Sequence, residues 1–292
     1  MSSNMYPAYA AGVVDCTVPP SLARAGGMGE QATRAFAAAG AYVTFGDLNE
    51  TSGLLLQSEL RPNAQFVKCD VTDFESQKRL FKAAKQNSPS KTVDIAIANA
   101  GISGTDPILK GEDTGGEPSA PDLTILNVNV VGVAYTCKLA RFYFLQHELT
   151  SGRDRCLIVL SSAAAYADVP GRLVYMMSKF AVRGAMRALR RGTVHDGIRA
   201  CALAPWFVET NFVSKEVIQF LHSKGVKFAN AKDAADAMLH IASDKSINGR
   251  CFAVVNREEA PLGYYDMDLD DFTDGSKAGE QQYQFLTISH AA

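Results

Sequence analysis

The feature that most constrains the fold is a regular alternation between short apolar runs and longer segments with helical periodicity. The runs are rich in β-branched, aromatic and small side chains, which is typical of strands buried on both faces. They span Ala41–Phe45, Gln65–Lys68, Val93–Ala98, Leu157–Ser161, Arg199–Leu203 and Cys251–Val255. Helices are predicted over Met28–Ala39, Thr51–Leu60, Phe74–Gln86, Pro121–His147, Val174–Thr193 and Ala231–Ser243. This order predicts an α/β fold, a doubly wound parallel sheet whose binding site lies beyond the carboxyl ends of the strands.

Composition argues against several classes of protein. The chain has 292 residues with 29 Lys or Arg and 31 Asp or Glu, so its formal net charge of −2 offers no general surface for nucleic acid. No run of 18 apolar residues and no basic-then-apolar leader is present, so neither a membrane span nor a signal peptide is predicted. The six cysteines are scattered singly. They have neither metal-ligand nor disulfide spacing, which favours a reducing, cytoplasmic compartment.

Glycines and an acid mark the ends of the first predicted strands. Gly26, Gly27 and Gly29 surround Met28 at the start of a helix, where small residues let a phosphate-bearing ligand approach free N–H groups. A tight loop without a ligand explains the same glycines equally well. Asp47 closes the next strand, where a carboxylate accepts hydrogen bonds from an adenosine ribose and repels a 2′-phosphate. No Arg or Lys lies near Asp47 in sequence, so NAD is favoured over NADP.

Polar or small residues also follow the third and fourth strands. Asp70 either caps the helix that begins near Asp73 or holds an adenine amino group, and the residues leave both roles open. Asn99, Ala100 and Gly101 end the fourth strand. Small residues with a turn-forming Asn suit a loop that passes close to a ligand.

A serine, a tyrosine and a lysine are the catalytic candidates. Ser162 follows the fifth strand, Tyr175 lies 13 residues beyond it, and Lys179 lies four residues further on. Tyr175 and Lys179 therefore share one face of a helix. A free tyrosine has a pKa of about 10, and a nearby ammonium lowers that pKa and equips the phenol for proton transfer. A surface Tyr–Lys pair without function has the same spacing.

Taken together, these pieces resemble the short-chain dehydrogenase/reductase family. In chain order they are GGMG, the Asp that closes strand two, CDVTD, NAG, NVVG, S-x(12)-Y-x-x-x-K and P-x-x-x-x-T, all within residues 26–210. SINGRCFAVV extends the match to about residue 255. The surrounding sequence is similar to fungal members that resemble 15-hydroxyprostaglandin and 5′-hydroxyaverantin dehydrogenases. The resemblance implies one Rossmann-type domain over residues 26–256, after an irregular segment 1–25 and before an acidic tail 257–292.

The resemblance also implies a role for each motif. Tyr175 would be the general acid/base, and Lys179 would lower its pKa and hold the nicotinamide ribose. Ser162 would orient the substrate carbonyl, and Asn129 would support a proton relay. The implied cofactor-binding residues are Gly27, Met28, Gly29, Asp47, Leu48, Asp70, Val71, Asn99, Ala100, Gly101, Tyr175, Lys179, Pro205, Val208 and Thr210.

The implied reaction is hydride transfer between NAD or NADP and a secondary alcohol or ketone. The substrate would be a hydrophobic small molecule, as in fungal secondary-metabolite biosynthesis. No metal, nucleic acid or membrane is implied. A homo-oligomer through the helices Pro121–His147 and Val174–Thr193 would be usual for the family.

The first strand departs from the family pattern. Members carry an apolar strand that runs into Thr-Gly, whereas this chain has Leu22 and Ala23 at those places and CTVPPS before them. Two adjacent prolines cannot donate to a sheet ladder. Three explanations stay open: Gly12–Cys16 supplies the strand after a long detour, the central strand is malformed, or the natural start differs. The departure motivates an alternative function, a protein of this fold without redox activity that acts as a cyclase, a dehydratase or a binding module.

Three segments fall outside the alternation. Residues 103–121 are predicted as a surface loop, and residues 207–230, with an amphipathic segment Val213–Leu221, as a mobile lid over a site. The stretch Glu258–Asp274 has seven acids and no basic residue. It is predicted as a solvated or partner-contacting tail, because its DMDLDD run lacks the glycine and closing Glu of a calcium loop.

Overall fold

One sheet organises the chain, as the alternation predicts. The computed structural model describes residues 12–16, 27–109, 116–150, 153–210, 215–271 and 275–290. Within them the strands lie in the order β3-β2-β1-β4-β5-β6-β7-β8, parallel except for the pair β7–β8. From the centre of the sheet, successive strands are added outward from β1 to β3 on one side and from β4 to β8 on the other. The topological switch point therefore lies between β1 and β4.

The elements match the predicted ones closely. The strands are β1 (Gly12–Cys16), β2 (Tyr42–Asp47), β3 (Ala64–Lys68), β4 (Ile95–Ala98), β5 (Cys156–Leu160), β6 (Arg199–Pro205), β7 (Arg250–Val254) and β8 (Tyr264–Leu269). The helices are α1 (Met28–Ala38), α2 (Glu50–Leu60), α3 (Phe74–Asn87), α4 (Thr124–Leu126), α5 (Val133–Phe144), α6 (Leu173–Gly192), α7 (Lys215–Ser223), α8 (Ala231–Ser243) and α9 (Lys277–His290). None of these described helices is long and apolar enough to cross a membrane.

The predicted helix Pro121–His147 is not continuous. A π-helical turn, η1 (Asn127–Gly132), separates α4 from α5, and a short 3-10 turn, η2 (Ala163–Ala165), follows β5. A π-turn is wider than an α-helical turn by less than one residue, and a single such turn is too short for apolar periodicity to distinguish it from a continuous helix.

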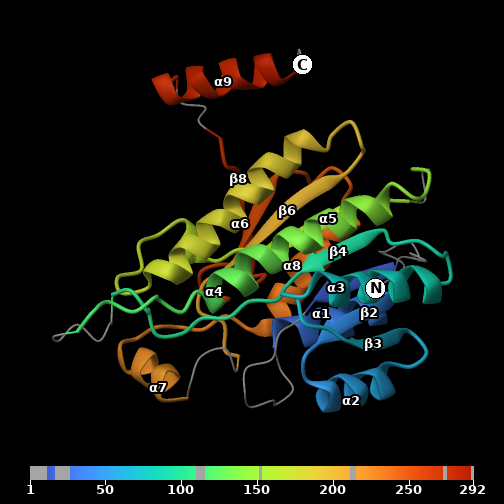
Figure 1. Ribbon diagram of the computed structural model, residues 1–292, viewed down its shortest axis with the longest axis horizontal. Helices are drawn as coiled ribbons and strands as arrows, with labels where there is room; N and C mark the ends of the chain where they lie inside the picture. Colours follow the sequence, from blue (N-terminus) through green and yellow to red (C-terminus); the bar gives the residue numbers. More distant parts are fainter. Residues whose placement is uncertain are drawn as a thin grey trace.

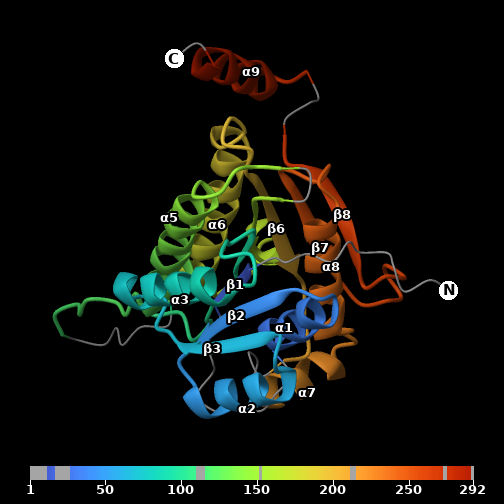
Figure 2. The same ribbon diagram turned by 90° about the vertical axis from the view of Figure 1, so that its right-hand side faces the viewer.

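Two layers of helices cover the sheet. Figures 1 and 2 show α3, α5 and α6 on one face, and α1 and α8 on the other. Alternate side chains of β5 divide between these layers. Ile158 belongs to the core with α1 and α8, whereas Leu157 and Val159 belong to the core with α3, α5 and α6. The strands β4, β5 and β6 are buried along their whole length, which accounts for their continuous apolar runs.

Gly12–Cys16 supplies the first strand. β1 pairs in parallel with β2, with Cys16 opposite Gly46, and with β4, with Asp15 opposite Ile97. Of the three explanations for the altered first strand, the structure supports the first, in which Gly12–Cys16 supplies the strand. The Pro-Pro pair and the places held by Leu22 and Ala23 lie outside the described residues.

The acidic stretch Glu258–Asp274 is not simply a solvated tail. β8 pairs antiparallel with β7, so the sheet extends past residue 256 (Figure 2). Asp270 binds Arg183 of α6 at 2.6 Å, and Asp271 binds Arg191 at 2.6 Å and the buried Arg190. The acids neutralise a row of arginines on α6. The sequence alone does not reveal this, because the arginines lie about eighty residues earlier in the chain. Residues 272–274 lie outside the described residues.

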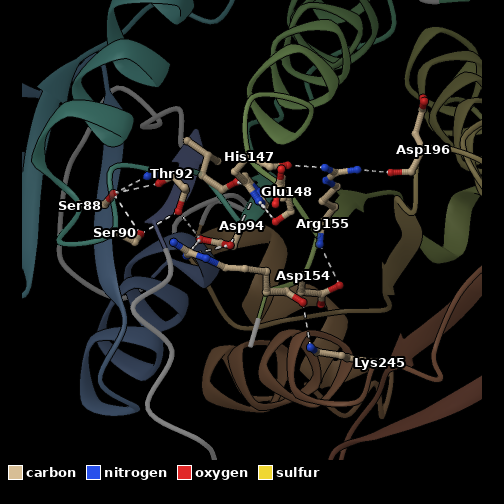
Figure 3. Close-up of polar contacts among 12 residues, drawn as sticks. Ser88, Ser90, Thr92, Asp94, His147, Glu148, Asp154, Arg155, Asp196 and Lys245 are labelled. Carbon is tan, nitrogen blue, oxygen red and sulfur yellow. Dashed lines mark hydrogen bonds and ion pairs between the residues drawn. The ribbon is translucent and has the colours of Figure 1, made fainter. Parts of the chain in front are cut away.

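A polar cluster ties the amino ends of the central strands together (Figure 3). Asp94, just before β4, accepts from Thr92 Oγ1 at 2.9 Å and from Arg153 at 3.0 Å. Asp154, just before β5, pairs with Arg199 of β6 at 2.5 Å. These charges are buried and paired, so they fix the amino edge while the carboxyl edge is left for binding.

The contact between Asp271 and α6 predicts a measurable contribution to stability. Asp271→Asn should lower the free energy of unfolding at pH 7 by about 3 kcal/mol, because it leaves the buried Arg190 without its counter-ion. Burial opposes ionisation of Asp271, but Arg191 and Arg190 hold its pKa below the usual value. A lowered pKa stabilises the fold above the unfolded value near 3.9 and loses that effect as the pH falls below it.

Denaturant titrations at pH 7 and pH 3 measure this contribution. The deficit of Asp271→Asn should shrink at pH 3. Asp268→Asn is the matched control, because Asp268 is an exposed acid of the same stretch that pairs with Arg250, and Asn tolerates its positive φ of 66°. Equal stability of Asp271→Asn and Asp268→Asn at pH 7 would contradict the role of Asp271.

Candidate active site

A cavity of about 510 Å3 opens at the carboxyl edge of the sheet, where the fold predicts the site. Most residues singled out in the sequence line it. They are Gly27, Met28, Gly29, Asp47, Asn99, Gly101, Ser162, Tyr175, Lys179, Pro205, Val208 and Thr210. The start of α1 and the ends of β2, β4, β5 and β6 therefore converge on one space.

The other predicted site residues do not line this cavity. Ala100 and Val71 lie in the core, and Leu48 is exposed. The helix-capping role considered for Asp70 is wrong, because Asp73 caps α3 by accepting from the Glu75 N–H. Asp70 instead accepts from Thr72 within its own turn. A contact of these residues with an adenine stays a prediction.

Ser162, Tyr175 and Lys179 lie together at one end of the cavity. Ser162 lies between β5 and η2, where it is the N-cap residue of η2, and its hydroxyl is hydrogen-bonded to the Tyr175 phenol. Lys179 lies one helical turn after Tyr175 on α6, with Nζ 5.7 Å from the centre of the tyrosine ring. Its ammonium donates to the Leu160 carbonyl oxygen at 3.0 Å. The strand end and the helix thus present three proton-handling groups to one point.

Burial and neighbouring charges set the acidity of these groups. Burial raises the pKa of Tyr175, whereas the hydrogen bond with Ser162 and the positive charge of Arg172 lower it. Burial also lowers the pKa of Lys179 to about 8. The expectation that Lys179 lowers the pKa of Tyr175 is therefore wrong. The pKa of Tyr175 lies above its ordinary value, and the groups that oppose this rise are Ser162 and Arg172.

Asn129 lies behind the site in the π-turn η1. Its side chain is fully buried, accepts from the Ile102 N–H at 2.8 Å, and donates to the Ile102 carbonyl at 2.9 Å and to Ser178 Oγ at 3.0 Å. A Cβ at Gly101 would lie 3.3 Å from Lys179 Nζ and 3.4 Å from Asn129 Oδ1. Glycine at this position therefore leaves room between the strand-end loop, the lysine and the amide.

Asp106 is a site-building residue that the sequence did not reveal. It lies in the segment predicted as a surface loop, yet its side chain is buried. One carboxylate oxygen accepts from the N–H groups of Ile108 and Leu109, and the other accepts from the Val174 N–H at 2.9 Å. Val174 belongs to the first turn of α6, which has no side-chain cap of its own. Asp106 therefore caps the helix that presents Tyr175.

The capping bonds keep Asp106 ionised. Burial opposes its ionisation, but the hydrogen bonds from Leu109, Val174 and Ile108 lower its pKa below the usual value. No local sequence pattern distinguishes Asp106 from a surface acid, because Val174 lies 68 residues away.

The other end of the cavity suits a dinucleotide. Gly27 begins α1 without a side-chain cap, so the first N–H groups of α1 can point to a phosphate. Asn99 Oδ1 is buried at the cavity wall without a hydrogen-bond partner, and a bound donor would satisfy it. Asp47 accepts from the Asn49 N–H at 2.7 Å at the end of β2. These donors and acceptors fit the phosphates and a ribose or amide of NAD or NADP.

One cation reaches this end, although none is near Asp47 in sequence. Arg34 of α1 lines the cavity, and its guanidinium donates to Glu30 at 2.8 Å and to Glu59 at 2.6 Å. Because Arg34 lies on α1, the residues next to Asp47 in the sequence do not reveal this cation. Two carboxylates neutralise its charge.

Apolar side chains form part of the cavity wall. The residues are Val169, Trp206, Phe207, Val217 and Leu221, of which the last two belong to α7. The predicted lid 207–230 is held at its base by a bridge between Val208 and Ala229. Its residues 211–214 lie outside the described residues, and its mobility stays a prediction.

Comparisons with known proteins show what this chain is similar to. Residues 22–254 match a protein family described as Enoyl-(Acyl carrier protein) reductase. The chain is 36% identical over 280 residues to a 5′-hydroxyaverantin dehydrogenase of Dothistroma septosporum, covering 88% of both chains. It is 32% identical over 272 residues to a 5′-hydroxyaverantin dehydrogenase of Emericella nidulans, covering 86% of both.

A solved structure has the same fold. It is a 3-ketoacyl-(acyl-carrier-protein) reductase from Brucella melitensis complexed with NADH, with a TM-score of 0.69. The match covers 84% of this chain and 97% of that one at 22% sequence identity.

The capping role of Asp106 predicts a local loss of order in Asp106→Asn. The amide NH2 group would face N–H donors on one side, so the amide hydrogen of Val174 should exchange faster and the melting temperature should fall. Asp122→Asn is the matched control, because Asp122 caps the Thr124 N–H within its own turn on the surface. Hydrogen exchange followed by mass spectrometry measures the effect. Unchanged exchange in the first turn of α6 would contradict the capping role.

Proposed function

This chain belongs to the short-chain dehydrogenase/reductase family, and on that basis we propose that it transfers hydride between NAD and a secondary alcohol or ketone of a hydrophobic small molecule. It is an NAD(P)-dependent oxidoreductase related to fungal dehydrogenases of secondary metabolism. The observation that carries the proposal is that one cavity contains both the start of α1 and the group of Ser162, Tyr175 and Lys179.

Proton transfer is the part of the reaction that this chain performs. In the oxidation direction the Tyr175 phenolate would accept the proton of the alcohol O–H while the carbinol carbon loses its hydrogen as hydride, and NAD would supply the hydride acceptor when bound. The Ser162 hydroxyl, hydrogen-bonded to Tyr175, holds the substrate oxygen at the phenol. In the reduction direction Tyr175 returns a proton to the carbonyl oxygen.

Lys179 and Asn129 position the groups that move the proton. Lys179 stands behind Tyr175 with its ammonium fixed on the Leu160 carbonyl, from where it can also reach a ribose of the cofactor. Asn129 binds both backbone groups of Ile102, so the loop after β4 and α6 keep a constant separation. These fixed contacts limit the reorganisation needed during proton transfer.

The charges at the adenosine end favour NAD over NADP. Asp47, Glu30 and Glu59 contribute three carboxylates, and Arg34 contributes one cation, so these four groups sum to −2. A 2′-phosphate would be repelled there, and the only cation of the group already binds two acids. NAD, which carries a 2′-hydroxyl, avoids this repulsion.

The apolar wall and the relatives indicate the first substrates to test. Trp206, Val217 and Leu221 suit a large, weakly polar molecule beside Tyr175. The two relatives above are named for the dehydrogenation of 5′-hydroxyaverantin. A function without redox chemistry was motivated by the altered first strand. The position of β1 at the centre of the sheet favours the redox function over that alternative.

The proposed reaction predicts turnover that depends on Tyr175. The full chain with NAD and 5′-hydroxyaverantin, or with a panel of apolar secondary alcohols, should form NADH. Tyr175→Phe should lower kcat by about 10²–10⁴-fold because it removes the proton carrier, with NAD affinity nearly unchanged. Tyr135→Phe is the control, because Tyr135 lies on α5 and is not among the cavity-lining residues. NAD binding without turnover in either direction would contradict the proposal.

The cofactor preference predicts a response to Asp47→Asn. The wild-type chain should bind NAD more tightly than NADP, and removal of one carboxylate should strengthen NADP binding roughly tenfold. Calorimetric titration with each dinucleotide measures the two affinities. Asp236→Asn, an acid of α8 outside the lining residues, should change neither affinity. Equal affinity of the wild type for NAD and NADP would overturn the preference.

A further inference from the structure

Arg172 is a cation at a position that does not stabilise its helix. It is the N-cap residue of α6, and its side chain makes no capping hydrogen bond. The amino end of a helix carries partial positive charge, so a guanidinium there is unfavourable. Asp106 provides the cap from another loop. Helix stability therefore does not explain an arginine at residue 172.

The guanidinium of Arg172 lies at the cavity wall with few protein partners. It lines the cavity with Ser162 and Tyr175, and its Nη1 donates to the Gly104 carbonyl oxygen. A guanidinium has five N–H donors, and no carboxylate of the described residues pairs with it. Its charge reaches the Tyr175 phenol, whose pKa it lowers. Most of its donors are therefore available to a ligand beside the reacting group.

The other cations of the cavity are already engaged. Lys179 is buried and donates to the Leu160 carbonyl oxygen. Arg34, at the adenosine end, is neutralised by Glu30 and Glu59. Among the described lining residues, Lys179 and Arg172 thus have no carboxylate partner, but Lys179 is buried, so Arg172 is the cation better placed to meet a ligand close to Tyr175.

The surroundings of Arg172 combine this charge with an apolar wall. Val169, Trp206, Val217 and Leu221 line the same cavity. A ligand that fits both features has a flat or bulky apolar body and one negatively charged oxygen. A guanidinium binds such an oxyanion through charge-assisted hydrogen bonds, which are about twice as strong as neutral ones.

We propose that Arg172 recognises an oxyanion of the substrate, so that the substrate is an apolar alcohol or ketone bearing a carboxylate or an ionised phenol close to the reacting carbon. This proposal rests on the proposed function, because it names the substrate class of the same site. It differs from a role of Arg172 in tuning Tyr175, which would affect charged and neutral substrates alike.

Binding of matched probes tests the proposal without requiring turnover. The full chain, with and without NADH, is titrated calorimetrically with 2-naphthoate and with 2-naphthamide, which have the same ring and differ in charge. The wild type should bind 2-naphthoate at least about tenfold more tightly. Arg172→Gln should abolish the difference. Arg172→Lys should retain part of it, because lysine keeps the charge and loses the planar fork.

A second probe pair separates the two sources of the oxyanion. A preference for 4-nitrophenolate over 4-nitroanisole indicates recognition of ionised phenols, and a preference limited to 2-naphthoate indicates carboxylates. Arg79→Gln is the control variant, because Arg79 is an exposed arginine of α3 that does not line the cavity. It should leave every preference unchanged.

Two results would overturn the proposal. One is equal affinity of the wild type for the charged and neutral members of both pairs, and the other is a charge preference that survives in Arg172→Gln. If Arg172→Gln does not fold, the wild type decides: its affinity for 2-naphthoate should fall as NaCl is raised while that for 2-naphthamide stays constant. An affinity for 2-naphthoate that is independent of salt then rejects the proposal.

The outcomes also separate this proposal from the proposed reaction. A preference for 2-naphthoate without NADH formation from any alcohol rejects the reaction and supports recognition by Arg172. Turnover of alcohols together with equal binding of the probes rejects recognition and supports the reaction.

Discussion

The backbone ladder that inserts β1 between β2 and β4 holds the rest of the structure in place. β2 and β3 with α2 form one side of the sheet, β4 to β8 form the other, and β1 is hydrogen-bonded to both. The cavity draws Asp47 from the first side and Asn99 and Ser162 from the second. Without this central strand a dinucleotide end and a proton-transfer end would not share one space, so β1 serves the site directly.

At the carboxyl edge the site is assembled by contacts between segments distant in sequence. Asp106 joins the loop after β4 to the first turn of α6, and Arg172 returns a hydrogen bond from α6 to that loop at Gly104. Both contacts join the start of α6, the helix that carries Tyr175, to the loop after β4. The amino edge of the sheet is instead closed by buried ion pairs such as Asp154 with Arg199. Buried ion pairs therefore stabilise the amino edge of the sheet, and the polar groups that line the cavity lie at the carboxyl edge.

Local chemistry in the sequence predicts much of this arrangement. Runs such as Cys251–Val255 identify buried strands, and the i, i+4 spacing of Tyr175 and Lys179 places both on one helix face. Contacts at long range could not be predicted in this way. Asp106 resembles any loop acid until Val174 is brought to it, and Arg34 reaches the adenosine end from a different helix. Asp270 and Asp271 read as a solvated acidic stretch because their arginine partners lie about eighty residues earlier on α6.

The central claim is that hydride passes directly between a substrate carbon and a nicotinamide within this cavity. The most direct measurement is a single turnover of the full chain with NAD and a secondary alcohol deuterated at its carbinol carbon, followed by mass spectrometry of the dinucleotide. The claim predicts that the deuterium is recovered on the reduced dinucleotide, with none released to water. Deuterium retained on the organic product, or released to solvent, would contradict it.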